Sequence, residues 1–425
     1  MAETSGKYDR RNFVLNVAEG ALFVAGSSLI SSQTVFPALI VRLGGGNILI
    51  GAFGVISWVG LFLPQIFAAR HTQTIRWKKP WAVRYGAIQR FFILAIGLVI
   101  LLGGKDLPAA ACALILALFG LNQIFTGITT PGWFDMYAKL TPLNRRGRLV
   151  GMRNALAGAG AFLCSFALTW ILTSFDFPLN FTFPFIAAFA LQFLSVILQS
   201  RLVEEYPSQS VPFQSLREYL RELVELVRTH RHFRSFLTAS AFFILASLPL
   251  SFFTVYGLEK FKAGESAVGE FTIAIVIGQF LGGIINGYIA DRHGNRLALL
   301  YATASMACAS AWALLAPTLL LFDVVFLLVG INLGSELMIR YNLASEFGST
   351  ERRSTYIGVM NTLLSPLYLF SLAAGWLSEK YGYVSLFGAG CACSVIGIVL
   401  LLSVVIEPRI SGPRGNRTTA EITET

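Results

Sequence analysis

Long apolar runs, separated by short polar connectors, recur along the whole sequence. A helix needs about 20 apolar residues to cross a bilayer, and twelve runs in this chain are long enough. The first six cover residues 12–40, 48–69, 85–104, 108–137, 150–173 and 182–201, and the second six cover 233–257, 268–290, 297–317, 319–341, 356–377 and 383–406. This pattern predicts an all-α polytopic membrane protein with twelve transmembrane helices.

Basic residues lie mainly in alternate connectors. If the N-terminus is cytoplasmic, 28 of the 33 Lys and Arg residues fall in or beside inner connectors, and five fall outside. Positively charged loops resist translocation, so this distribution predicts that both termini lie in the cytoplasm. We expect the protein to reside in the plasma membrane. The same distribution accounts for the net charge of +10, and we expect no nucleic-acid partner.

The composition excludes the soluble classes of protein. Hydrophobic residues make up 55% of the chain and charged residues only 13%, too few to cover the surface of a soluble domain of this length. The five cysteines lie inside apolar runs, and the four histidines lie in charged connectors. This placement indicates neither a disulfide framework nor a metal site, and we expect no cofactor.

A polar connector at 203–232 divides the chain into two halves. It contains the capping-box pattern Ser215-Leu216-Arg217-Glu218, and apolar residues then recur at helical spacing with charges on the other face. We therefore expect an N-terminal six-helix bundle over 1–202, a cytoplasmic linker with an amphipathic helix along the membrane, a C-terminal six-helix bundle over 233–406 and a cytoplasmic tail over 407–425.

The two halves resemble each other in sequence. Residues 140–156 align with residues 347–363 at one offset of 207. The positions that are identical in the two segments are Arg145/Arg352, Arg146/Arg353, Gly151/Gly358, Asn154/Asn361 and Leu156/Leu363. Six helices repeated in the same orientation form one known transporter architecture, in which the substrate site lies near the membrane midplane.

One connector resembles a family signature. The segment Gly287-Tyr-Ile-Ala-Asp291-Arg292-His-Gly294-Asn-Arg296 is similar to the loop motif G-x-x-x-D-R-x-G-x-R of the major facilitator superfamily. The two glycines suit a close helix approach and a tight turn, and Asp291 suits a helix N-terminus or an arginine partner.

The resemblance implies two pseudo-repeated bundles and a loop that closes on the opposite half, and Glu346 or Glu351 are the expected partners of Arg292 or Arg296. The first half has Ala69 where the second has Asp291, which argues against two symmetrical latches.

Polar residues form stripes on four of the predicted helices, spaced three or four residues apart so that each set shares a face. These are the first, fourth, seventh and tenth helices, which line the central cavity in the family that the chain resembles. The candidate substrate residues in the stripes are Asn16, Ser27, Ser31, Asn122, Thr126, Trp133, Ser247, Ser251, Asn332 and Arg340. A close-packed interface between polar helices would give similar stripes.

Two carboxylates lie inside predicted spans, where ionisable groups are costly and usually functional. Desolvation favours the neutral acid, so Glu19 on the first helix is a candidate for gaining and losing a proton during transport. Glu336 on the tenth helix is a second candidate, although Arg340, one turn away, would neutralise it. In the repeat, Glu19 aligns with Ala239, so the acid is not part of the duplicated scaffold.

These features favour a secondary active transporter that moves a small solute by alternating access, functions as a monomer and is coupled to protons through Glu19. No nucleotide-binding motif occurs in the inner connectors, so transport would be driven by a gradient or would be facilitated diffusion. A non-transporting membrane sensor or scaffold with the same fold is an alternative. A multispan membrane enzyme is a weaker one, because no acid or histidine cluster suggests a catalytic site.

Overall fold

The computed structural model describes residues 8–142, 145–208, 216–348 and 353–407. In these ranges the chain is helical and contains no strand. Contacts between residues divide it into two units, one formed by 1–214 with 254–276 and the other by 215–253 with 277–425. The predicted all-α class is therefore confirmed, and each unit is described separately below.

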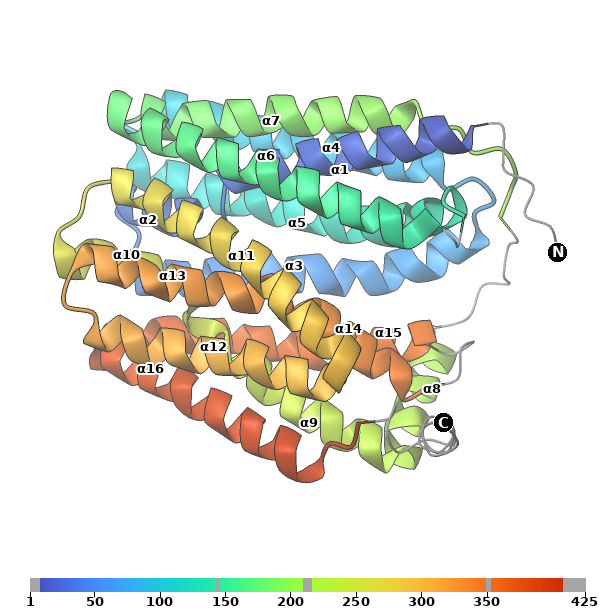
Figure 1. Cartoon of the computed structure of the whole chain (residues 1–425). Helices are drawn as coiled ribbons and strands as arrows, with labels where there is room; N and C mark the ends of the chain where they lie inside the picture. Colours follow the sequence, from blue (N-terminus) through green and yellow to red (C-terminus); the bar gives the residue numbers. More distant parts are fainter. Residues whose placement is uncertain (1–7, 143–144, 209–215, 349–352, 408–425) are drawn as a thin grey trace. The chain divides into compact units, whose positions relative to one another are not determined.

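The first unit is built on seven helices, which Figure 1 shows in blue to green. They are α1 (Asp9–Leu29), α2 (Val35–Arg42), α3 (Asn47–Thr74), α4 (Lys79–Gly103), α5 (Pro108–Lys139), α6 (Arg146–Ser174) and α7 (Leu179–Ser200). Helix α1 packs on α6 and α7, α4 packs on α5 and α7, and α3 packs on α5. A cluster of buried phenylalanine rings, with centroids 4.5–5.2 Å apart, joins α2, α3, α5 and α7 through Phe36, Phe53, Phe119 and Phe185.

The first unit also contains the segment 254–276, from α10 (Phe252–Phe261) and the start of α11 (Ser266–His293). Arg42 Nε lies 3.1 Å from Glu265 Oε1, and the hydroxyls of Thr34 and Thr272 are 2.7 Å apart. The Thr254 hydroxyl donates to the carbonyl of Gln33 over 2.7 Å. Polar contacts thus attach this segment to α2 and to the chain before it.

The second unit contains the remaining helices, which are α8 (Leu216–Thr229), α9 (Arg231–Ala246), η2 (Leu248–Ser251), α12 (Asn295–Leu315), α13 (Leu319–Leu333), α14 (Glu336–Glu346), α15 (Arg353–Leu364), η3 (Ser365–Leu369) and α16 (Phe370–Val404). Helix α16 packs on α9 and α12, and α12 packs on α13 and α14. The later part of α11 meets α13 closely, because a Cβ on Gly278 or Gly282 would overlap the α13 backbone. Glycine is therefore required at both positions.

Several predicted spans are broken helices. The first consists of α1 and α2 with a turn between them, and the seventh consists of α9, η2 and α10. Pro249 lies in η2 and Pro366 in η3, where a missing N–H interrupts the α-helical hydrogen bonds. Interrupted helices of this kind are typical of transporter sites, because the freed backbone groups can face a cavity.

The number of crossings agrees with the sequence pattern. Eleven helical segments in the described residues are long and apolar enough to span a bilayer. The last of them, Tyr356–Val404, contains two of the predicted runs and is divided at Gly382, whose φ of 79° is non-helical. Twelve predicted spans are thus accommodated.

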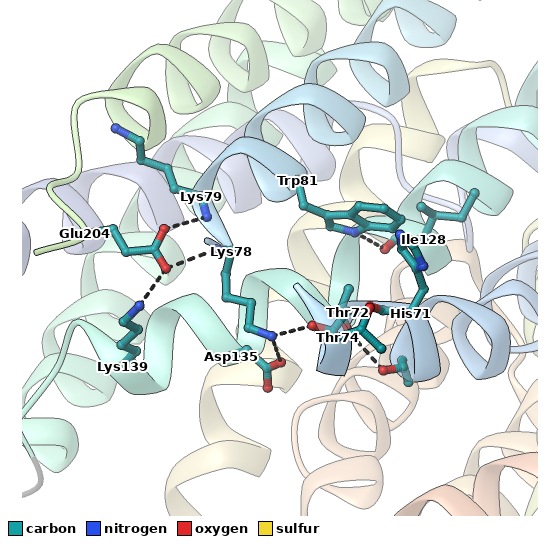
Figure 2. Close-up of polar contacts among 11 residues, drawn as sticks. His71, Thr72, Thr74, Lys78, Lys79, Trp81, Ile128, Asp135, Lys139 and Glu204 are labelled. Carbon is teal, nitrogen blue, oxygen red and sulfur yellow. Dashed lines mark hydrogen bonds and ion pairs between the residues drawn. The ribbon is translucent and has the colours of Figure 1, made fainter. Parts of the chain in front are cut away.

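Each unit has a glutamate that caps the helix following its second long span. In the first unit, Glu204 accepts the backbone N–H groups of Lys78 and Lys79 at the start of α4, both at 3.0 Å, and lies 2.9 Å from Lys139 Nζ (Figure 2). In the second unit, Glu407 accepts the N–H of Arg296 at the start of α12 over 2.7 Å. Carboxylates satisfy the free N–H groups of a helix N-terminus and complement its dipole.

A second ion pair lies beside Glu204 in Figure 2. Lys78 is buried, with its Nζ 3.6 Å from Asp135 Oδ2 and bonded to the carbonyl of Thr72. These contacts connect the ends of α3, α4, α5 and α7. Arg146, at the start of α6, does not take part and donates to the carbonyls of Ala138 and Thr141.

Glu204→Gln should lower the stability of the first unit by about 2 kcal/mol, because Lys139 loses its buried charged partner and two N–H groups lose a charged acceptor. Thermal unfolding of the purified protein in detergent measures the change. The matched control is Glu205→Gln, since the adjacent Glu205 is exposed and should tolerate the substitution. Equal unfolding temperatures for the two variants would contradict the capping role.

Candidate functional site

A cavity of about 210 Å³ lies inside the first unit, among α1, α4, α5, α6 and α7. Its charged lining consists of Glu19, Arg90 and Arg153, and its aromatic lining consists of Phe23, Trp133 and Phe134. The neutral polar residues that complete it are Gln89, Thr126, Thr129, Thr130 and Gln199. The cavity therefore combines a few charged groups with an apolar wall, as small-molecule sites commonly do.

Glu19 on α1 forms an ion pair with Arg153 on α6. Arg153 Nη1 lies 2.9 Å from Glu19 Oε2, and the Glu19 side chain is only 4% exposed. Gly20 makes the contact possible, because a Cβ at that position would overlap the Arg153 guanidinium. The guanidinium also lies 4.8 Å from the centre of the Trp133 ring, so a cation–π contact fixes its other side.

Arg90 on α4 is buried and is held by neutral groups. Its Nε donates to the carbonyl of Gln192 over 2.9 Å, its Nη1 to the carbonyl of Gly86 over 2.7 Å, and its Nη2 to Ser195 Oγ over 3.1 Å. Its guanidinium lies 5.0 Å from the centre of the Phe23 ring. Arg90 is therefore rigidly placed, but no carboxylate of the described residues is bonded to it.

The sequence did not single out these two arginines, since both were assigned to basic inner connectors. A signal was nevertheless present, because Arg90 and Arg153 fall within the apolar runs 85–104 and 150–173. An arginine inside a span is a functional candidate for the same reason that Glu19 is. Arg153 is the ion-pair partner of Glu19, and Arg90 lines the same cavity.

Several buried polar atoms around the cavity have no hydrogen-bond partner in the described residues. They include both side-chain polar atoms of Asn16, Oε1 of Gln199 and Oε1 of Gln192. Asn16 and Gln199 are 1% and 2% exposed. Of these residues Gln199 lines the cavity, and because buried polar groups are normally satisfied, its Oε1 suits a bound solute or water.

The predicted polar residues of the first half fall into two groups. Thr126 and Trp133 line the cavity beside Glu19. Asn16, Ser27, Ser31 and Asn122 are not among its lining residues, and Asn122 and Ser27 are used in helix packing. Asn122 Nδ2 donates to the carbonyl of Gln89 over 2.9 Å, and Ser27 Oγ accepts from Gln192 Nε2 over 3.1 Å.

Four of the predicted residues of the second half meet in the second unit. Ser247, Asn332, Glu336 and Arg340 line a small cavity of about 20 Å³ together with Tyr368. Arg340 Nε lies 3.3 Å from Glu336 Oε1, which is the local pairing that the sequence offered as an alternative to proton coupling. Ser251, the remaining predicted residue, lies in η2 and does not line this cavity.

The predicted gating loop joins α11 to α12. Gly294 has a φ of 93°, and a Cβ there would lie 2.8 Å from Glu407, so the expected tight turn is present. The expected close helix approach at Gly287 is absent, since a Cβ there would meet no described atom within 4 Å. Asp291 lies in the last turn of α11, at the opposite end of a helix from the one expected, and is exposed.

The arginines of this loop have other partners than the sequence suggested. Arg296 donates from its guanidinium to the carbonyls of Leu401 and Leu402, whereas Glu346 accepts from Asn295 Nδ2. Arg292 lies 4.7 Å from the centre of the Tyr288 ring. Glu351, the other predicted partner, lies outside the described residues. Main-chain carbonyls at the end of α16 thus take the place of the expected carboxylate.

A scan of family models matches residues 77–370 to the Major Facilitator Superfamily. A search of curated proteins finds no match. Solved structures resemble the whole chain at low sequence identity. A POT family transporter in complex with a thioalcohol-conjugated peptide is 11% identical with a TM-score of 0.70, and 95% of this chain and 97% of that chain are covered.

Two other solved structures are similar. The nucleoside transporter NupG (a D323A mutant) is 12% identical with a TM-score of 0.68, covering 94% of this chain and 100% of that one. The xylose transporter XylE from E. coli, in an inward-open conformation, is 14% identical with a TM-score of 0.66, covering 97% and 100%. At these identities the likeness establishes the fold and leaves the substrate open.

A double-mutant cycle tests the ion pair between Glu19 and Arg153. Each single change, Glu19→Gln or Arg153→Gln, leaves a buried charge without its partner, so the double variant should lose less stability than the sum of the two, by on the order of 2 kcal/mol. Thermal unfolding in detergent gives the three differences. Arg84→Gln, at an exposed position of α4, is the control and should add independently to Glu19→Gln; additivity for Arg153 as well would refute the pair.

Proposed function

Since the chain belongs to the Major Facilitator Superfamily, we propose that its cavity around Glu19 is the site where the movement of a small solute is coupled to protons. The chain is an integral membrane protein and a secondary transporter, and it is not an enzyme. The observation that carries the proposal is the buried ion pair of Glu19 and Arg153 on the wall of a cavity.

The ion pair supports coupling for an electrostatic reason. Arg153 favours the charged form of the buried carboxylate and burial favours the neutral form, and protonation removes the attraction and frees the guanidinium. Glu19 can therefore exchange one proton for a change in the contacts of Arg153. Because Arg153 is on α6 and Glu19 on α1, that exchange changes the forces between two packed helices.

Alternating access requires two bodies that move against each other. We assign them to the sequence repeats 1–202 and 233–406, joined by the linker 203–232 and followed by the tail 407–425. The segment 254–276, attached by Arg42–Glu265 and Thr34–Thr272, serves as the contact that opens when the solute enters or leaves on that side. Its polar character favours reversible opening, since a partly exposed ion pair such as Arg42–Glu265 and a single hydroxyl contact are each weak.

The remaining assignments concern orientation, location, oligomeric state and the role of Glu336. We place both termini in the cytoplasm, because the basic connectors would otherwise have to be translocated. We also assign the protein to a plasma membrane. The transporter acts as a monomer. Glu336 is paired with Arg340 on its own helix and has a smaller part in coupling than Glu19, whose partner is on another helix.

Proton flux in proteoliposomes tests the proposal. Vesicles with an internal pH dye are challenged with a panel of sugars, organic acids, amino acids and cationic drugs. Wild type should give a substrate-evoked pH change, and Glu19→Gln should lose it while still exchanging labelled substrate. Glu336→Gln is the matched control and should keep at least half of the pH response.

Two results would overturn the proposal. An unchanged pH response in Glu19→Gln would exclude this residue as the coupling group. Absence of any substrate-dependent flux or exchange with correctly folded protein would favour the alternative of a non-transporting sensor or scaffold.

A further inference from the structure

The charges that face the cavity of the first unit do not cancel. Helix α1 contributes Glu19, α4 contributes Arg90 and α6 contributes Arg153. The neighbouring helix α5 adds the phenol of Tyr137, 6.0 Å from Arg153 as a cation–π contact, and the lining residue from α7 is the neutral Gln199. When Glu19 is ionised, two cations and one carboxylate face the cavity. When Glu19 is protonated, two cations face it and the carboxylate charge is gone.

The hydrogen bonds of Arg90 do not compensate its charge. All of its acceptors, the carbonyls of Gln192 and Gly86, Gln89 Oε1 and the Ser195 hydroxyl, are neutral. They orient the guanidinium, but a net positive charge inside a membrane-spanning bundle remains costly. The cavity of the second unit differs, since Glu336 and Arg340 face it as a balanced pair.

Arg153 has the capacity to bind a further group. Its Nη1 faces Glu19 and the carbonyl of Asn16, its Nε packs against Gly20, and the described residues offer no acceptor to Nη2. The hydroxyl protons of Thr126, Thr129 and Thr130 are already donated to the main chain of α5. The charged donor left for a solute is thus Nη2 of Arg153, which can form a charge-assisted hydrogen bond to a carboxylate oxygen.

We propose that this cavity binds a small organic monoanion, with its carboxylate held by Arg153, its charge balanced by Arg90 and its apolar part against Phe23 and Trp133. The inference rests on the proposed function and names its substrate class. With Glu19 ionised, one solute carboxylate neutralises the single uncompensated cation of the cavity, and with Glu19 protonated it lowers the excess from two cations to one. The volume of about 210 Å³ lies below the range typical of drug-sized ligands, so the solute is small.

The same geometry sets the order of proton and solute. Glu19 and the solute carboxylate compete for Arg153, so protonation of Glu19 leaves two cations for the solute, and its binding is tighter at low pH. The proton and the anion therefore bind to the same state and move in the same direction.

Direct binding to the purified full chain in detergent tests the inference without requiring transport. The probes are three acids, benzoate, phenylacetate and isobutyrate, each titrated by calorimetry beside its uncharged amide. At least one acid should bind at least tenfold more tightly than its amide. Lowering the pH from 7.5 to 5.5 should tighten acid binding several-fold, and Glu19→Gln should bind tightly at both values.

Variants identify the group that holds the carboxylate. Arg153→Gln should weaken acid binding at least tenfold and leave amide binding unchanged, whereas Arg153→Lys, which keeps the charge, should retain part of the preference. Arg84→Gln is the control and should bind like wild type. Unfolding temperatures within a few degrees of wild type show that each variant is folded.

Three results would overturn the inference. They are the absence of binding by all three acids, equal affinity for acids and amides, and stronger competition by inorganic phosphate than by any acid. Failure of the anion site can be distinguished from failure of the proposed coupled transport. Acid binding without proton flux would contradict coupled transport and leave the anion site standing, whereas flux driven only by an uncharged solute would do the reverse.

Discussion

The need to keep Glu19 and Arg153 together inside an apolar bundle constrains much of the first unit. Neither charge is stable there alone, so α1 and α6 must approach closely enough for a 2.9 Å contact. Gly20 provides the space, Trp133 covers the guanidinium, and α4 brings Arg90 to the same cavity through bonds to α7. The packing of α1, α4, α5, α6 and α7 thus serves a polar contact as well as an apolar core.

A second constraint acts at the helix ends. The N-terminus of α4 is capped by Glu204 and that of α12 by Glu407, each placed just after the last long helix of its half. The two glutamates are an internal repeat that the alignment of residues 140–156 with 347–363 did not contain. Glu204 and Glu407 follow the last apolar run of each half, in the segments Val203-Glu204 and Ile406-Glu407. A single acid among connector residues does not by itself predict a helix cap.

The apolar runs predicted the fold well, because length and hydropathy are nearly sufficient to specify a membrane-spanning helix. The helix breaks in the first span, in the seventh span and between α13 and α14 of the tenth span depend on local backbone contacts. The length of an apolar run does not predict such breaks. Glu19 was recognisable as a buried acid, but Arg90 and Arg153 were counted as loop charges. For Arg296, the expected partner was Glu346 or Glu351, but its guanidinium donates to carbonyls of α16 and Glu346 accepts from Asn295 instead.

The two halves share a scaffold but differ in chemistry. In the repeat, Glu19 aligns with Ala239, which is fully buried in α9 and cannot pair with a cation. The second unit instead keeps Glu336 and Arg340 on one helix, where the pair is neutral and its cavity of about 20 Å³ holds little more than water. A pair within one helix remains intact when helices move, whereas a pair between α1 and α6 responds to any change in their separation. The two halves therefore share their helices, whereas the pair between helices on which the proposed coupling rests joins α1 and α6 of the first unit.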